Sequence, residues 1–243
     1  MKLKLEGCSN AGFSLTDVRK EQILKLAEWV IKHREDSKKT YKQIQNEIER
    51  ESEYLDSSKV RMLVPFLRKM GYVNNEGFEQ KNSLISLSDF FTDEGICFVE
   101  YLKMTSKIML LDKNDIENKI EEVNGLFNMI NMINLINNGE EIYIDTIAFL
   151  KKYRTMDKNE FFFMTTLKKK YEGEQYIKML DKAICKYRKG AFKRIKIIKH
   201  QNAYNYVKSF LIETNLIIQS EHSISLNGKY WNIVNKIINY VGE

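Results

Sequence analysis

The chain has 243 residues, of which 43% are hydrophobic, so it can bury one large core or two smaller ones, and wholesale disorder is excluded. Lys and Arg number 39 against 33 Asp and Glu, and the formal charge of +6 hints at a polyanionic partner. An AT-rich genome would give the same wealth of Lys, Asn and Ile without such a partner. The single proline, Pro65, favours long helices over a loop-rich β fold.

The cysteines and the N-terminus indicate the compartment. Cys8, Cys97 and Cys185 lie far apart without a Cys-x-x-Cys pair, which argues against disulfides and zinc knuckles. The N-terminus lacks the apolar run of a signal peptide. The most apolar stretch, residues 126–136, is about half as long as a bilayer span requires. We therefore expect a cytoplasmic protein with no membrane segment.

The first half of the chain predicts three helices, a hairpin and a fourth helix. The first helix opens at Thr16, the second at a capping box from Thr40 to Gln43, and the third at Asp56. Pro65 should bend or break the third helix, because it cannot donate to the carbonyl of Arg61. Residues 72–73 and 84–87 read as the hairpin, and the fourth helix follows. This is the winged-helix order, in which the third helix enters the major groove.

The second half repeats that plan loosely. Helical patterns, one of them opened by a capping-box analogue from Asp157 to Glu160, cover residues 116–137, 142–153, 157–167, 176–187 and the region after 202. A hairpin over 216–219 and 224–226 and a closing helix over 230–240 follow. We expect a mainly α fold with short β-hairpins, built as tandem winged-helix domains. The first would cover 1–112, and 113–243 would hold a helical linker and the second.

The third helix and the hairpin of the first half carry basic side chains off the apolar stripe. Arg can fork onto guanine and Lys can bind phosphate, although any solvated helix face carries such residues. The candidate DNA-binding residues here are Lys59, Arg61, Arg68, Lys69 and Lys81.

The strongest charge signal is the run 186–199, which has seven basic residues and no acid. Such a run repels itself unless a polyanion or an acidic neighbour offsets it, so phosphate contact and a solvated helix end are both open. Exposed asparagines after it can read adenine, or provide ordinary surface polarity. The candidate DNA-binding residues here are Arg188, Lys189, Lys193, Arg194, Lys196, Lys199, Asn202, Asn205 and Lys208.

Catalytic patterns are scarce. His33, His200 and His222 are isolated, and no phosphate-binding loop or nucleophile elbow occurs. Glu79 and Lys81 have the Glu-x-Lys spacing of metal-dependent nucleases, but they fall in the predicted wing and not on a buried strand. We expect no catalytic residue, no metal and no cofactor.

Several segments resemble the DNA-recognition region of type IIS restriction endonucleases, in particular AlwI-like and nicking enzymes and, more distantly, FokI-like enzymes. They are residues 58–73 (SKVRMLVPFLRKMGYV), 91–95 (FTDEG), 156–164 (MDKNEFFFM), 214–218 (TNLII) and 224–227 (ISLN). The resemblance implies a monomer that reads a short asymmetric DNA site. In that family a nuclease domain follows the recognition part, and the chain stops at Glu243, where that domain would begin. We therefore expect a recognition part or subunit that partners a nuclease domain or subunit.

Two other functions stay open. A plasmid-type replication initiator or transcription regulator also uses tandem winged helices, but would bind repeated sites. A winged-helix adaptor for protein interactions needs no basic face. Binding to one asymmetric site, to repeats, or to no DNA distinguishes the three.

Overall fold

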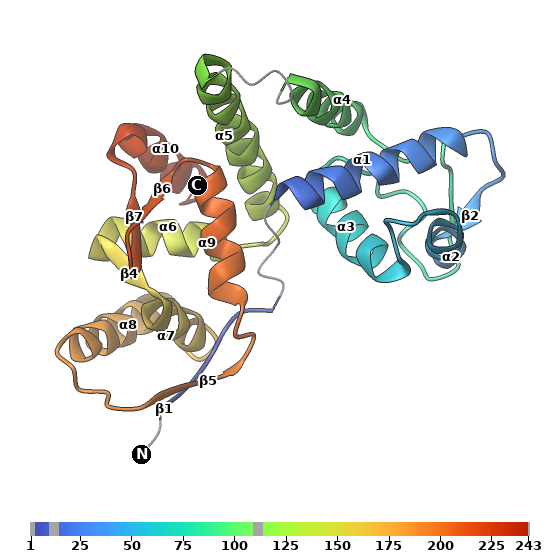
Figure 1. Ribbon diagram of the computed structural model, residues 1–243. Coiled ribbons are helices and arrows are strands. Elements are labelled where there is room, and N and C mark those ends of the chain that lie inside the picture. Colours follow the sequence, from blue (N-terminus) through green and yellow to red (C-terminus); the bar gives the residue numbers. More distant parts are fainter. Residues whose placement is uncertain (1–2, 10–14, 109–113, 243) are drawn as a thin grey trace. The chain divides into compact units, whose positions relative to one another are not determined.

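The computed structural model describes residues 3–9, 15–108 and 114–242, which form two compact units (Figure 1). The N-terminal unit is Leu15–Val123. The C-terminal unit is Asn124–Glu243 together with Met1–Ser14. Both units are mainly helical with a few short strands, as the sequence predicts. Among the described residues, none of the helices has both the length and the hydrophobicity of a membrane span.

The N-terminal unit contains helices and a short two-stranded sheet. Its elements are α1 (Asp17–Lys32), β2 (Lys39–Thr40), α2 (Tyr41–Glu51), α3 (Ser57–Lys69), β3 (Leu84–Ile85) and α4 (Asp93–Ile108). β2 pairs antiparallel with β3, and Lys39 lies opposite Ile85. The fully buried side chains include Ile23, Leu26, Ile44, Leu63 and Phe90.

The predicted caps of this unit are confirmed. Thr40 Oγ1 accepts from Gln43 N at 3.3 Å, and Gln43 Oε1 accepts from Thr40 N at 2.8 Å. Asp56 Oδ1 accepts from Lys59 N at 2.8 Å at the start of α3. Each cap satisfies a backbone amide that has no partner inside its helix.

The sequence predicts a bend or a break at Pro65, and the structure shows no break there. α3 stays helical from Ser57 to Lys69, with Pro65 inside it. Pro65 and Arg61 lie on the exposed face, so the carbonyl of Arg61, which loses its helical donor, is on the side where water can bind it. The opposite face, with Val60, Leu63 and Val64, is buried and holds the helix in place.

The hairpin predicted in the first half has a different pairing. The sequence predicts that residues 72–73 pair with 84–87. Instead, β3 pairs with β2, and Val73 forms an antiparallel bridge with Phe91. A strand as short as β2 has no alternating pattern that could reveal it beforehand.

The C-terminal unit is larger and contains two sheets. Its elements are β1 (Leu3–Glu6), α5 (Asn114–Asn137), α6 (Ile142–Tyr153), β4 (Thr155–Asp157), α7 (Lys158–Lys168), α8 (Gly173–Arg188), β5 (Ile195–Lys199), α9 (Ala203–Glu213), β6 (Ile217–Gln219), β7 (Ser223–Leu226), a 3-10 turn (Gly228–Tyr230) and α10 (Trp231–Gly242). The helix α5 begins before the unit boundary at Asn124. β7 lies between β4 and β6 and is antiparallel to both. The core of the C-terminal unit is rich in aromatic side chains, and Tyr143, Phe161, Phe162 and Phe210 are fully buried in it.

The two units share an order of elements. In each, a helix leads to a short strand whose last residue, Thr40 or Asp157, caps the next helix through a capping box. That strand pairs antiparallel with a later one, β2 with β3 and β4 with β7. In each unit a helix comes before the later strand of this pair. It is α3 in the N-terminal unit and α9 in the C-terminal unit. The C-terminal unit inserts α8 and β5 between its capped helix and α9.

The predicted boundary of the first domain, residues 1–112, differs from the structure at the N-terminus. β1 pairs in parallel with β5 of the C-terminal unit, and Leu5 is buried there. Thr165 Oγ1 of α7 donates to Glu6 O at 2.6 Å, and Thr166 Oγ1 accepts from Glu6 N at 2.7 Å. A strand whose partner lies nearly the whole chain away leaves no local signal of this pairing.

Candidate nucleic-acid interface

Charge is divided unequally between the units. The C-terminal unit has 21 Lys and Arg against 12 Asp and Glu, a formal +9, and the N-terminal unit has 18 against 21, a formal −3. The whole positive excess of the chain therefore lies in the C-terminal unit. A polyanion would be attracted to that unit and weakly repelled by the other.

The basic segment, residues 186–199, consists of the end of α8, a loop and the strand β5. Most of its cations are exposed and form no ion pair with any residue that the structure describes. They are Lys186, Lys189, Lys193, Arg194 and Lys196. These side chains are exposed, which fits both alternatives of the sequence analysis, phosphate contact and a solvated surface.

Two members of the segment have acidic partners. Arg188 Nε lies 2.6 Å from Glu160 Oε1, and its other nitrogens donate to the carbonyls of Tyr153 and Thr155 at 3.1 and 2.8 Å. The Glu160 hydrogen bond is the main cause of the raised pKa of Arg188. Lys199 Nζ lies 3.9 Å from Glu6 Oε1. The predicted phosphate contact through Arg188 is therefore not supported, because the fold already uses its donors.

The helix α9 follows β5 after a link of three residues, 200–202. It buries one face through Ala203, Val207 and Phe210. The opposite face exposes the predicted Asn202 and Asn205. The side chain of Asn202, at the N-cap, makes no capping bond.

Sequence reasoning missed Tyr206 and overestimated Lys208 on this helix. Tyr206 is 46% exposed beside Asn205 and presents an aromatic ring with a hydroxyl. Its place off the apolar stripe was a signal that could have revealed it. Lys208 is half-buried, with Nζ 5.8 Å from the centre of the Tyr204 ring.

The hairpin after α9 forms as predicted from β6 and β7. Its turn is closed by a bond from Ser220 N to Ser223 O at 2.8 Å, and Glu221 and His222 are exposed at its tip. The hairpin therefore presents polar side chains close in sequence to the exposed face of α9.

In the N-terminal unit, most predicted contacts are engaged or half-buried. Lys59 pairs with its own helix cap, Asp56, at 3.2 Å. Arg68 donates to Asn75 Oδ1 at 3.0 Å and lies 4.4 Å from the centre of the Phe78 ring, so it fixes the loop after α3. Lys69 is half-buried.

Arg61 and Lys81 are the exposed candidates of that unit. Arg61 lies on the outer face of α3, and its side chain has no hydrogen bond or ion pair with the described part of the chain. Lys81 lies in the loop between Val73 and β3, and Glu79 of the Glu-x-Lys pattern is exposed in the same loop. Within the described ranges, no group of three His, Cys, Asp or Glu side chains could hold a metal ion.

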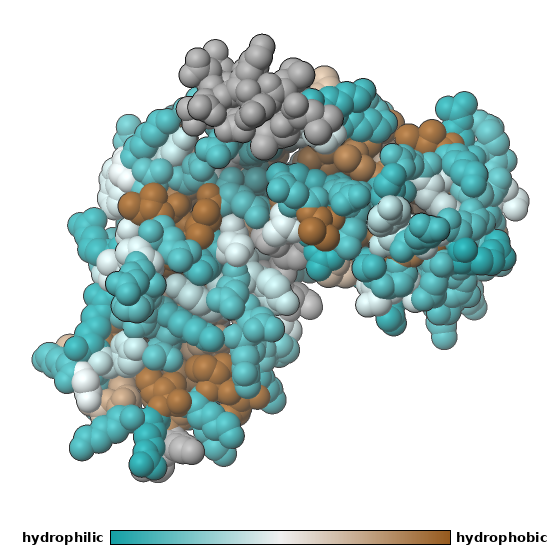
Figure 2. All heavy atoms as spheres, in the orientation of Figure 1, coloured by the Kyte–Doolittle hydropathy of each residue, from teal (hydrophilic) through white to brown (hydrophobic). Residues whose placement is uncertain are grey.

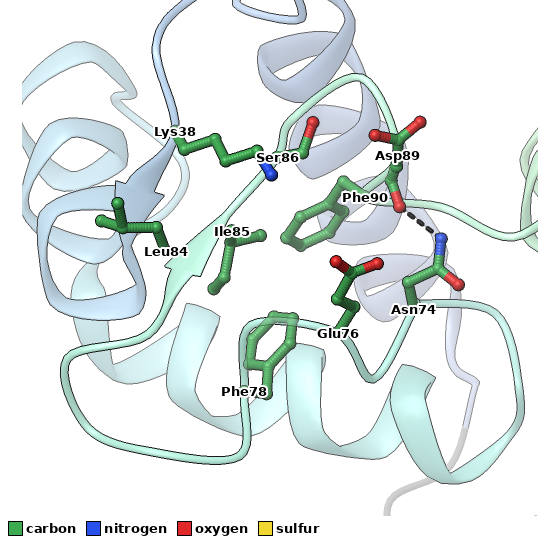
Figure 3. Close-up of a pocket in the computed structure, with 9 residues that line it drawn as sticks. All are labelled: Lys38, Asn74, Glu76, Phe78, Leu84, Ile85, Ser86, Asp89 and Phe90. Atoms are coloured by element: carbon green, nitrogen blue, oxygen red, sulfur yellow. Dashed lines mark hydrogen bonds between the residues drawn. The ribbon is translucent and has the colours of Figure 1, made fainter.

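A small cavity lies in the described part of the N-terminal unit. Figure 3 shows Phe78, Ile85 and Phe90 around a cavity of about 30 Å³, with Asn74 bonded to the carbonyl of Asp89. This space holds about one water molecule, so it is too small for an organic substrate.

A larger hollow of about 230 Å³ lies in the C-terminal unit. Its lining includes Cys8, Glu141, Asp145 and Lys168. Lys168 Nζ lies 2.6 Å from Asp145 Oδ1 and 2.8 Å from Glu141 Oε2, so its polar groups satisfy one another. Burial raises the pKa of the Cys8 thiol to about 11, which keeps it protonated and poorly nucleophilic.

Comparison with known proteins does not assign the chain to a family. No protein-family model, curated protein or solved structure matches the chain significantly.

The exposed charged and polar side chains of the C-terminal unit could contact a long polar ligand. Hydrophilic residues cover most of the face seen in Figure 2, and hydrophobic ones appear in separate patches. Exposed cations on the basic segment stand next in sequence to exposed amides and a phenol on α9. Cations attract phosphates, and amides can hydrogen-bond to base edges.

Proposed function

We propose that the chain binds double-stranded DNA, mainly through its C-terminal unit. In this proposal α9 lies in the major groove, where Asn202, Asn205 and Tyr206 meet base edges. The exposed cations of the basic segment bind the flanking phosphates. The observation that carries the proposal is the +9 charge of this unit, with a basic segment that leads directly into α9.

The proposal includes a winged-helix fold for each unit. Its support is the shared order, in which the short strand after the first helix pairs with a strand beyond the third helix. On this interpretation α3 and α9 are the two recognition helices. Arg61, exposed on α3, would add base preference from the N-terminal unit.

A narrower hypothesis is that the chain is the recognition part of a type IIS restriction endonuclease. It rests on the resemblance of residues 58–73 and 156–164 to that family. It requires one asymmetric site for each protein molecule.

Selection of bound sequences from a random duplex pool tests the function. We expect enrichment of one short asymmetric site. Enrichment of repeated sites would favour a replication initiator or a transcription regulator. No enrichment, with no retention of any duplex at low salt, would contradict DNA binding and favour a protein-interaction adaptor.

A further inference from the structure

The N-terminal strand β1 places a lysine directly beside a lysine of the basic segment. The strands β1 and β5 lie side by side (Figure 1). In this parallel pair, Lys4 is the register partner of Lys196, and Leu3 and Leu5 are partners of Ile195 and Ile197. Paired residues on neighbouring strands are about 4.8 Å apart and point to the same face. Both lysines are exposed.

The other face of this ribbon is used by the fold. Leu5 is only 2% exposed, Ile197 is half-buried, and β1 packs against α7. The alternation of a strand therefore forces Lys4 and Lys196 outwards together. Neither forms an ion pair with a described residue.

The nearest acid on the strand is occupied elsewhere. Glu6 Oε2 lies 3.2 Å from Lys169 Nζ, and Glu6 Oε1 lies 3.9 Å from Lys199 Nζ. These cations lower the pKa of Glu6, and the Lys169 hydrogen bond is the main cause. Like charges on paired residues of neighbouring strands repel each other. Within the described residues, Lys4 and Lys196 therefore have no ion-paired acid to offset their two charges.

We infer that β1 is part of the nucleic-acid surface and that Lys4 and Lys196 together bind the sugar–phosphate backbone of a DNA duplex. The inference rests on the proposed function and adds a contact from the opposite end of the chain. β5 leads within three residues into α9, and a helix in the major groove is flanked by phosphates. A phosphate held between the two lysines neutralises the charge that the free ribbon leaves uncompensated.

The inference predicts opposite effects on stability and on binding. Lys4→Glu places a carboxylate opposite Lys196, so the free protein should melt at a higher temperature. The same change should weaken binding, since the carboxylate repels the phosphate. Lys4→Gln should lower the slope of log affinity against log salt by about 0.9, the loss of one phosphate contact.

The experiment uses the full chain and a fluorescently labelled mixed-sequence DNA duplex in anisotropy titrations over a series of salt concentrations. Lys236→Glu is the matched control, because Lys236 is exposed on α10 and the change in net charge is the same. Alkylation of Cys8 reports whether β1 stays docked. If Lys4→Glu releases β1, the test is decided by Lys4→Gln alone.

The inference is supported if Lys4→Glu melts at a higher temperature and binds the duplex more weakly than the wild-type chain, while Lys236→Glu changes neither quantity by much. If both Lys4 variants bind duplex like Lys236→Glu while Lys193→Ala weakens binding, the inference is wrong and the proposed function stands. If the wild-type chain binds no duplex, both are wrong. Loss of binding to phosphatidylserine vesicles in the Lys4 variants, with unchanged duplex binding, would assign the lysine pair to a membrane surface.

Discussion

Arg188 and Glu160 form an ion pair, with Arg188 Nε 2.6 Å from a carboxylate that is almost completely buried. The guanidinium also donates to the carbonyls of Tyr153 and Thr155, at the junction of α6 and β4. These bonds fix the end of α8 to the end of α6 and the start of β4. The start of the basic segment is therefore held in place against the rest of the C-terminal unit.

Arg188→Ala should lower the free energy of unfolding by about 2 kcal/mol, because it leaves the buried Glu160 carboxylate without its cation, although the half-exposed guanidinium is partly screened by water. Lys189→Ala, at the exposed neighbour, should change it by less than about 0.5 kcal/mol. Urea denaturation followed by circular dichroism measures both. Equal stability of the two variants would mean that the pair does not hold α8 in place.

The capping box at Thr40 should contribute measurably to the N-terminal unit. Thr40→Ala removes the oxygen that accepts from Gln43 N and should cost about 1 kcal/mol. Thr40→Ser keeps that oxygen and should retain most of the stability. Thermal denaturation compares the variants, and an equal loss in both would assign the effect to the methyl group of Thr40.

Cys8 should report the docking of β1. The exposed Cys97 and Cys185 should be alkylated by iodoacetamide well before Cys8 at neutral pH. Burial holds the pKa of Cys8 near 11, so its rate should rise about tenfold per pH unit up to that value. Mass spectrometry of quenched samples measures each site. Rapid modification of Cys8 at pH 7 would show that β1 leaves the C-terminal unit.

Elements with local signals could be predicted from the sequence, and elements with distant partners could not. The caps at Thr40, Asp56 and Asp157 and the hairpin of β6 and β7 were predicted, because side-chain oxygens and turn residues act over a few positions. β1, β2, β4 and β5 were missed. Strands of two to five residues have too few positions for an alternating pattern, and their partners are set by the tertiary fold.

The candidate site shows the same division. The exposure of Lys193 and Arg194 follows from a run with no apolar periodicity. The internal role of Arg188 does not, because Glu160 lies on another helix and its burial is a tertiary property. The pairing of Lys4 with Lys196 likewise needed the three-dimensional register.

Asn205→Ala should weaken binding to the selected site and relax the base preference at one position, and should leave the affinity for other sequences nearly unchanged. A bidentate contact of Asn with adenine contributes about 1–3 kcal/mol of discrimination at one position of the site. The measurement is competition binding to the selected site and to its single-base variants. Arg61→Ala, tested in the same way, examines α3. A uniform loss over all sequences would make the changed residue a phosphate contact.

The salt dependence of duplex binding tests the central claim most directly. The triple variant Lys193→Ala, Arg194→Ala, Lys196→Ala should flatten the slope of log affinity against log salt by up to about 2.7, about 0.9 for each lost phosphate contact. Lys32→Ala, Lys38→Ala, Lys107→Ala removes the same charge from exposed positions of the N-terminal unit and should leave the slope nearly unchanged. Equal slopes in the wild-type chain and both triple variants, or no binding to any duplex, would contradict the account.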